Sequence, residues 1–151
     1  MSRTTRLGII GAGNIGAVHM KEFGKLADRC EIVAIADVSG ALAEARAKEF
    51  GVPNALDNPE RLIARDDVDA VVIGVPNNFH ADLAILALES GKHVLLEKPM
   101  GLNAEHAKRI VRAQQKTGNV LMVSHQMRWE WLTQQVKDQV EKGALGRIYS
   151  A

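Results

Sequence analysis

A glycine-rich segment near the start of the chain holds the first residues whose types and spacing suggest chemistry. It has the pattern G-x-G-x-x-G and consists of Gly11, Ala12, Gly13, Asn14, Ile15 and Gly16. It follows a short apolar run and opens a segment with helical periodicity. In that context Gly11 permits a tight turn, Gly13 lets a pyrophosphate approach the backbone, and Gly16 allows close helix–sheet packing. The free N–H groups of the helix start would bind the phosphates, so the segment predicts a dinucleotide-binding turn.

Asp37 is the second candidate binding residue. It lies 21 residues after Gly16 at the end of a predicted strand, where an acidic side chain accepts hydrogen bonds from an adenosine ribose. A carboxylate there repels a 2′-phosphate, and Val38 and Ser39 supply no guanidinium to bind one. The position therefore favours NAD over NADP as the cofactor. The alternative is an aspartate that only begins the turn into the next helix.

Three further polar groups follow predicted strands. They are Val75-Pro76-Asn77-Asn78-Phe79-His80, Glu97-Lys98-Pro99 and Ser124-His125-Gln126-Met127-Arg128-Trp129. Each one alone is typical of a turn or a helix cap. Together they fall at the carboxyl ends of strands, which is the edge where open α/β sheets bind ligands. Lys98, beside a bound cofactor, is a candidate for proton transfer.

The candidate binding residues named above would be positioned by strands and helices that alternate along the chain. Apolar runs predict strands at residues 6–11, 31–37, 70–75, 92–97 and 120–124, with a weaker one near 54–56. The runs are nearly continuous, as in strands buried on both faces. Helical segments lie between them. Their expected N-caps are Ser39, Asn58 and Asn103, and their expected C-terminal glycines are Gly51, Gly91, Gly118 and Gly143. This order predicts an α/β fold, a Rossmann-type doubly wound parallel sheet with helices on both faces.

Length and composition limit the classes of protein that need considering. The chain has 151 residues, 19 Lys+Arg and 18 Asp+Glu, giving a net charge of +1. That charge gives no reason to expect nucleic acid or an anionic membrane as a partner. No apolar stretch reaches the ~18 residues that a membrane span requires, and the single Cys30 cannot form an intrachain disulfide. We therefore expect a cytoplasmic protein.

Two weaker signals predict no additional site. A basic stripe lies on one predicted helix, at Lys108, Arg109, Arg112 and Lys116. No aromatic platform for bases accompanies it, so we interpret it as a solvated helix face. The five histidines lack metal-ligand spacing and Cys30 stands alone, so no metal site is expected.

Taken in order, these motifs resemble those of the Gfo/Idh/MocA oxidoreductases, the relatives of glucose–fructose oxidoreductase and inositol dehydrogenase. The most specific part is residues 91–100, Gly-Lys-His-Val-Leu-Leu-Glu-Lys-Pro-Met. The resemblance implies that Glu97 and Lys98 lie by the nicotinamide ribose and the substrate. Lys98 would then orient the substrate and join the proton relay, and Lys98–Pro99 would be a cis peptide.

The resemblance also assigns roles around the dinucleotide groove. Pro76, Asn77 and His80 would line it, and Arg128 with Trp129 would approach the nicotinamide end. Val75 departs from the family pattern, because members often carry Thr or Ser there and Val removes one hydroxyl contact to the cofactor.

The same resemblance divides the chain into two parts. Residues 1–125 would form the dinucleotide-binding domain. Residues 126–151 would form a connecting helix and the first strand of a truncated second domain that binds substrate and supplies the general base. We therefore expect the isolated chain to bind NAD without dehydrogenase activity, and we expect a homo-oligomer.

These observations lead to one main functional hypothesis. The chain would be the NAD-binding domain of an oxidoreductase that transfers a hydride between nicotinamide and a secondary alcohol of a sugar, polyol or related compound. Two alternatives stay open, because the fold alone does not separate them: an NAD-binding sensor or regulatory module without turnover, and an NAD-dependent glycosidase.

Overall fold

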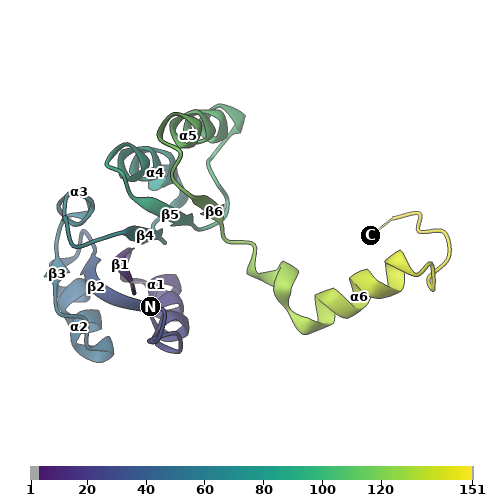
Figure 1. Cartoon of the computed structure of the whole chain (residues 1–151), viewed down its shortest axis with the longest axis horizontal. Coiled ribbons are helices and arrows are strands. Elements are labelled where there is room, and N and C mark those ends of the chain that lie inside the picture. Colours follow the sequence, from purple (N-terminus) through teal and green to yellow (C-terminus); the bar gives the residue numbers. More distant parts are fainter. Residues whose placement is uncertain (1–3, 151) are drawn as a thin grey trace.

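Parallel strands form a single twisted sheet in the computed structural model, which describes residues 4–150 (Figure 1). The strands are β1 (Thr5–Ile10), β2 (Cys30–Ala36), β3 (Ala55–Leu56), β4 (Ala70–Ile73), β5 (His93–Leu96) and β6 (Leu121–Val123). The helices are α1 (Asn14–Gly24), α2 (Gly40–Phe50), α3 (Pro59–Ile63), α4 (His80–Glu89), α5 (Ala104–Thr117) and α6 (Trp131–Glu141). Two short 3₁₀ helices, η1 (Asn77–Phe79) and η2 (Gln126–Trp129), precede α4 and α6.

The strand order explains where a ligand can bind. The order across the sheet is β3-β2-β1-β4-β5-β6. The chain runs outward from β1 to β3, then crosses back to β4 on the other side of β1. Ile10 at the end of β1 is level with Ala36 of β2 and Ile73 of β4. The order therefore reverses between β1 and β4, and open α/β sheets bind ligands in the crevice at that point. The predicted doubly wound Rossmann sheet is confirmed.

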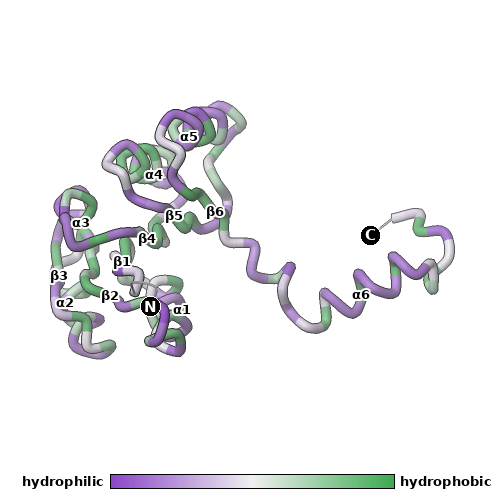
Figure 2. Tube along the Cα trace, viewed as in Figure 1, coloured by the Kyte–Doolittle hydropathy of each residue, from purple (hydrophilic) through white to green (hydrophobic). Residues whose placement is uncertain are grey.

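Both faces of the sheet are buried, which explains the continuous apolar runs. Ile9 packs with residues of α1 and α2 on one face, whereas Ile10 packs with residues of α3, α4 and α5 on the other. Successive side chains of a strand point to opposite faces, so an apolar residue is needed at each position. Figure 2 shows hydrophobic colour along the strands, while α4 and α5 alternate between hydrophobic and hydrophilic.

Local signals fix where the helices begin and end. The side-chain oxygen of Asn58 accepts a hydrogen bond from the Arg61 N–H at 3.0 Å, and that of Asn103 accepts one from the His106 N–H at 2.9 Å. Ser39 caps α2 in the same way. The glycines expected after helices all have positive φ; they are Gly51, Gly91, Gly118 and Gly143. The predicted caps are therefore confirmed.

The segment after β6 differs from expectation in one respect. The connecting helix is present as α6, and it projects away from the sheet (Figure 1). Residues 142–150 form turns and irregular structure, so the strand expected there is not formed. The reason is physical: a strand needs a neighbour for its N–H and C=O groups, and none of the described strands lies beside this segment.

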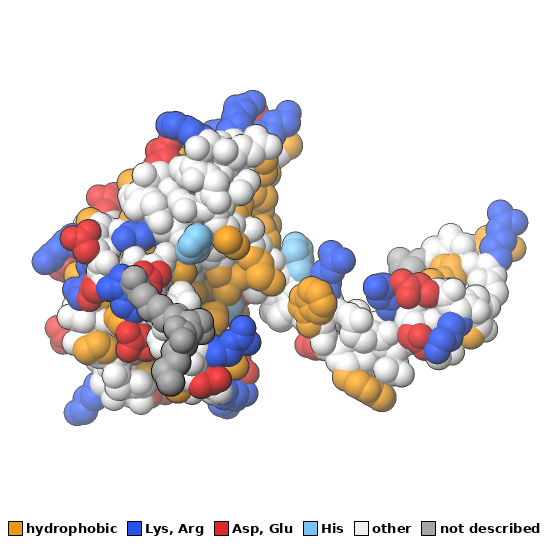
Figure 3. All heavy atoms as spheres, viewed as in Figure 1, with side chains coloured by type: hydrophobic (Ala, Val, Ile, Leu, Met, Phe, Trp, Pro, Cys, Tyr) orange, Lys and Arg blue, Asp and Glu red, His pale blue; other side chains and the backbone are white. Residues whose placement is uncertain are grey.

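The surface of this projecting segment is apolar at several positions. Trp131, Leu132 and Val136 of α6 are exposed, Trp131 to 75%. Figure 3 shows apolar side chains along the same segment. Among residues 4–150, no helix combines the length and apolar character needed to cross a membrane.

Candidate functional site

The glycine-rich turn connects β1 to α1. Gly11 has φ +102°, a conformation that favours glycine, and its N–H donates to the Ala36 carbonyl at 2.8 Å. A Cβ on Gly11 would overlap the carbonyl oxygen of Gly74, and a Cβ on Gly16 would overlap that of Gly11. The turn, the first helix and the end of β4 are thus packed backbone against backbone, which only glycine permits.

The start of α1 is open toward the crevice. Gly13 is the N-cap residue, and no atom lies within 4 Å of the position that a Cβ would occupy there. No side chain of the described residues caps this helix, and its first turn carries no acidic residue. Its free N–H groups, at Asn14, Ile15 and Gly16, therefore face a space that a phosphate can enter.

Asp37 joins this turn to the end of β2. Its Oδ2 accepts the N–H of Ala12 at 2.8 Å, and its Oδ1 accepts the N–H of Ser39 at 2.9 Å. Arg46 holds the same loop from α2, where its Nε donates to the Ala12 carbonyl at 3.2 Å. The carboxylate is half-buried, so it shapes the loop and still borders the crevice.

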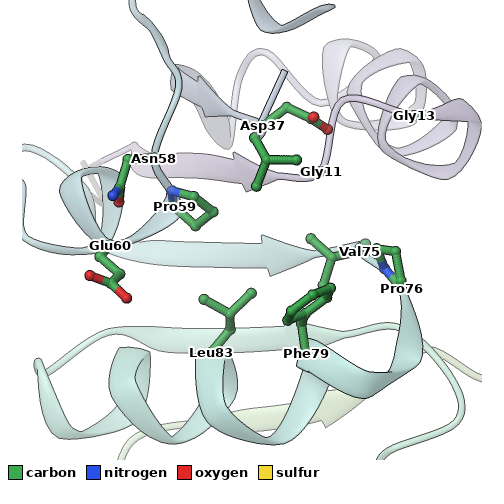
Figure 4. Close-up of a pocket in the computed structure, with 12 residues that line it drawn as sticks. Gly11, Gly13, Asp37, Asn58, Pro59, Glu60, Val75, Pro76, Phe79 and Leu83 are labelled. Atoms are coloured by element: carbon green, nitrogen blue, oxygen red, sulfur yellow. The ribbon is translucent and has the colours of Figure 1, made fainter. Parts of the chain in front are cut away.

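A cavity of about 530 Å³ begins beside this loop. Figure 4 shows Phe79 and Leu83 projecting from η1 and α4 toward Val75 and Pro59, with Asp37 near Gly13. The volume lies within the usual range for small-molecule sites, roughly 300–1,000 Å³. The walls are mainly apolar and a carboxylate lies at one border, an arrangement that suits a flat heterocycle carrying a hydroxylated sugar.

Several lining residues were not predicted from the sequence. Pro59, Phe79 and Leu83 come from three different elements and meet only in the fold. Gly74 also borders the cavity, and a Cβ there would contact Ile15 at 2.9 Å. A glycine at the carboxyl end of a buried strand was the one signal that could have identified it.

Glu97 and its partners lie after β5. The side chain is only 6% exposed. Its Oε1 lies 2.9 Å from Nε2 of His19 in α1, and its Oε2 accepts the Lys98 N–H at 3.1 Å. Burial raises the pKa of Glu97, but hydrogen bonds from His19, Ser124 and the Lys98 amide outweigh burial, so the pKa lies below its usual value. Glu97 is therefore an ionised, fully engaged carboxylate. His19 was not predicted as a site residue.

The Lys98 side chain is exposed and, within the described part of the chain, unpaired, whereas that of Glu97 is buried and hydrogen-bonded. The Lys98 ammonium has no hydrogen-bonding or ionic partner among residues 4–150. The Lys98–Pro99 peptide bond is cis, as expected. Lys98 therefore carries an unpaired cation next in sequence to the buried Glu97 carboxylate.

His80 is placed differently from its predicted neighbours in the groove. It is 0% exposed, with Nδ1 2.7 Å from the Pro99 carbonyl and Nε2 2.9 Å from the Val75 carbonyl. It does not border the cavity, and it links the loop after β4 to the loop after β5. Its direct contact with a cofactor stays a prediction.

The remaining predicted residues divide into two groups. Pro76 borders the cavity. Asn77 opens η1 and is exposed but does not border the cavity. Arg128 is exposed in η2, on the segment that leaves the sheet, and also lies outside the cavity lining (Figure 1). The roles of Asn77 and Arg128 stay predictions. Within residues 4–150 no group of three His, Cys, Asp or Glu side chains could hold a metal ion.

A doubly wound parallel sheet with a glycine-rich turn, an open helix start and a strand-end aspartate defines a dinucleotide-binding domain. Comparison with protein families agrees. Residues 5–125 match the Gfo/Idh/MocA family, described as an oxidoreductase family with an NAD-binding Rossmann fold. The chain belongs to this family, which confirms the resemblance seen in the motifs, and NAD is its cofactor.

Three of the matching relatives are named as dehydrogenases. D-glucoside 3-dehydrogenase of Escherichia coli K12 is 35% identical over 149 residues, covering 98% of this chain and 42% of the relative. Scyllo-inositol dehydrogenase of Lactobacillus casei, solved with NAD(H) and scyllo-inositol, is 28% identical with a TM-score of 0.88, covering 97% and 43%. The WlbA dehydrogenase of Bordetella pertussis, solved with NADH and UDP-GlcNAcA, is 33% identical with a TM-score of 0.90, covering 97% and 45%. The chain thus spans less than half the length of these relatives.

Proposed function

We propose that this chain is the NAD-binding part of a dehydrogenase that oxidises a secondary alcohol of a sugar, polyol or related compound. One observation carries the proposal. The apolar cavity with Asp37, the open start of α1, and the Glu97–Lys98 pair follow one another along the carboxyl edge of the sheet, after β2, β1 and β5. A dinucleotide laid along that edge would meet an adenosine site, a phosphate site and a reacting end in that order.

The adenosine end would be held by shape and by one carboxylate. The apolar walls at Pro59 and Phe79 suit the faces of an adenine ring. Both oxygens of Asp37 already accept one backbone N–H each, and a carboxylate has about four lone-pair sites. Two acceptor sites therefore stay available for ribose hydroxyls, while the negative charge disfavours a 2′-phosphate.

At the other end, Lys98 would act on the substrate. When bound, NAD supplies the acceptor for the hydride that leaves the substrate carbon. The unpaired ammonium of Lys98 would donate a hydrogen bond to the substrate oxygen, orient it, and stabilise the negative charge that grows there as the general base expected in the substrate domain accepts the hydroxyl proton. The relatives bear the names of inositol and D-glucoside dehydrogenases, which supports a polyhydroxylated substrate.

The proposal also includes a substrate domain and a homo-oligomer. We expect residues 126–151 to connect the domain of residues 1–125 to a substrate domain, because the relatives are more than twice as long as this chain. We also expect a homo-oligomer, since the exposed apolar residues of α6 favour association. Sedimentation of the full chain measures this directly, and a monomer at micromolar concentration would contradict it.

The test is turnover, with NAD and a panel containing myo-inositol and methyl glucosides, by this chain in the protein that includes the expected substrate domain; residues 1–151 alone should bind NADH without turnover. Replacing Lys98 by Ala should lower kcat by about 10²- to 10³-fold, because removing one donor that stabilises a developing oxyanion costs about that much. The Kd for NADH should change little. Lys108→Ala, an exposed lysine of α5, is the matched control and should behave like wild type.

Three results would contradict the proposal. NADH binding without turnover of any polyol or sugar favours a sensor. Release of a sugar from a glycoside without net NADH favours a glycosidase. Equal losses of NADH affinity and kcat in Lys98→Ala would remove Lys98 from the reaction.

A further inference from the structure

We propose that His19 is a positioning residue for the reaction, which holds the Glu97–Lys98 segment in place from the cofactor-binding helix. This inference rests on the proposed function and adds to it a residue of α1 that does not line the cavity. Its evidence is a buried contact between two elements that are 78 residues apart in the chain.

The contact joins two nearly buried side chains. His19 Nε2 lies 2.9 Å from Glu97 Oε1, and the two side chains are 14% and 7% exposed. A carboxylate removed from water needs partners for its charge, because an unsatisfied buried charge is costly. Of the described partners of Glu97, His19 is the one that comes from α1; the others are Ser124 after β6 and the Lys98 amide.

The direction of the hydrogen bond follows from the carboxylate. Glu97 is ionised and can only accept, so Nε2 of His19 carries the proton and donates. The imidazole ring is itself held by packing, because it stacks on Phe23 one helical turn further along α1, with centroids 6.2 Å apart and planes at 25°. A hydrogen-bond donor with restricted orientation is thus aimed at the carboxylate.

The other oxygen of Glu97 accepts the Lys98 N–H. The bond to His19 limits the rotation of the carboxylate, and the carboxylate in turn holds the backbone that carries the reactive ammonium. Since α1 also begins at the phosphate-binding turn, one helix would hold the phosphates at its start and orient Lys98 through His19 in its second turn. Misplacing a reacting group by about 1 Å can cost 10²-fold in rate.

Four single variants and one double variant, made in the protein that includes the expected substrate domain, test this inference. His19→Phe keeps an aromatic ring and removes the donor, whereas His19→Gln keeps an N–H donor. Glu97→Gln removes the charge that His19 contacts. Val18→Ala is the matched control, because Val18 is the neighbouring residue on the same helix and is 53% exposed. The measurements are kcat, KM for the polyol substrate, and the Kd for NADH from fluorescence titration.

We expect His19→Phe to lower kcat by about 10- to 100-fold while the Kd for NADH changes less than about threefold. His19→Gln should recover most of kcat. The double variant of His19→Phe and Glu97→Gln should be no slower than Glu97→Gln alone, because the two residues act through one interaction. Val18→Ala should match wild type.

The inference is overturned by His19→Phe with wild-type kcat, by His19→Gln as slow as His19→Phe, or by multiplicative losses in the double variant. A loss of NADH affinity equal to the loss of kcat would show a general effect on the fold of α1 and would also overturn it. A wild-type protein without turnover contradicts the proposed function itself, and the inference with it. An active wild type with an unaffected His19→Phe contradicts the inference alone.

Discussion

Asp37 has a structural role in this fold, and its role in binding ribose stays a prediction. The sequence left open whether it binds a ribose or only begins a turn. In the structure its two oxygens accept the N–H groups of Ser39, in the turn, and of Ala12, in the glycine-rich loop. The carboxylate therefore shapes the loop, and its remaining lone pairs stay available to accept hydrogen bonds from ribose hydroxyls.

Replacing Asp37 by Arg should reverse the cofactor preference. The substitution removes the acceptor for ribose hydroxyls and adds a guanidinium that pairs with a 2′-phosphate. Losing or gaining one charge-assisted hydrogen bond is worth about 1.5–3 kcal/mol. We therefore expect NAD to bind about 10- to 100-fold more weakly and NADP to bind more tightly, as measured by calorimetric titration.

Asp37→Asn is the control for this substitution, because its amide oxygen still accepts a backbone N–H while the charge is lost. It should weaken discrimination against NADP without reversing it. An unchanged preference in Asp37→Arg would remove the ribose role.

Glu97 predicts a particular dependence of stability on pH. Its pKa is lower in the folded protein than its ordinary value of 4.5, so the folded state binds protons less readily than the unfolded state. Its contribution to stability is therefore full above pH 4.5 and is lost as the pH falls through the folded pKa. Unfolding by urea at pH 7 and at lower pH, in wild type and in Glu97→Gln, measures this. The difference between the two proteins should shrink with falling pH, and a constant difference would contradict it.

At the scale of elements, local signals were read correctly and contacts between elements were not. The strands, the caps at Asn58 and Asn103, and the turn at Gly11 each depend on a few neighbouring residues. The contact between His19 and Glu97 requires knowing that α1 lies beside the end of β5. The apolar cavity likewise combines residues from three elements. Such pairs have no periodicity or spacing that marks them in a single sequence.

The burial of His80 depends both on a local signal in the sequence and on contacts between elements. Its sequence context places it near the groove, but its spacing from Ala84 and Ala87 also puts it on the buried face of α4. The buried position prevailed, because both ring nitrogens reach backbone carbonyls inside the fold. The burial of His80 could therefore have been predicted from the helical periodicity of this segment.

The packing of α1 on the glycine-rich turn gives a sharp prediction. Gly16→Ala would place a Cβ against the carbonyl of Gly11, so the helix must shift outward. We expect a loss of about 1–3 kcal/mol in the free energy of unfolding and weaker NADH binding. Gly24→Ala lies on the same helix with nothing within 4 Å of the new Cβ. It should raise stability by about 0.4–1 kcal/mol. Chemical denaturation measures both, and equal effects of the two substitutions would contradict the packing argument.

At the scale of the molecule, the topology determines the order of the site. Because the strands are parallel, the loops after β1, β2 and β5 share one edge of the sheet, and the strand order reverses there between β1 and β4. That edge presents the apolar cavity, the start of α1 and the Lys98 ammonium. The exposed apolar residues of α6 and the greater length of the relatives support the substrate domain that we propose. The sequence predicted this arrangement through motif order, whereas the shape of the cavity required the fold.

A crystal structure of the full chain with NADH tests the central claim most directly. The account predicts adenine between Pro59 and Phe79, a ribose hydroxyl donating to Asp37, the pyrophosphate at the start of α1, and the nicotinamide beside Lys98. A cofactor bound outside this cavity, or a nicotinamide directed away from Lys98, would contradict it.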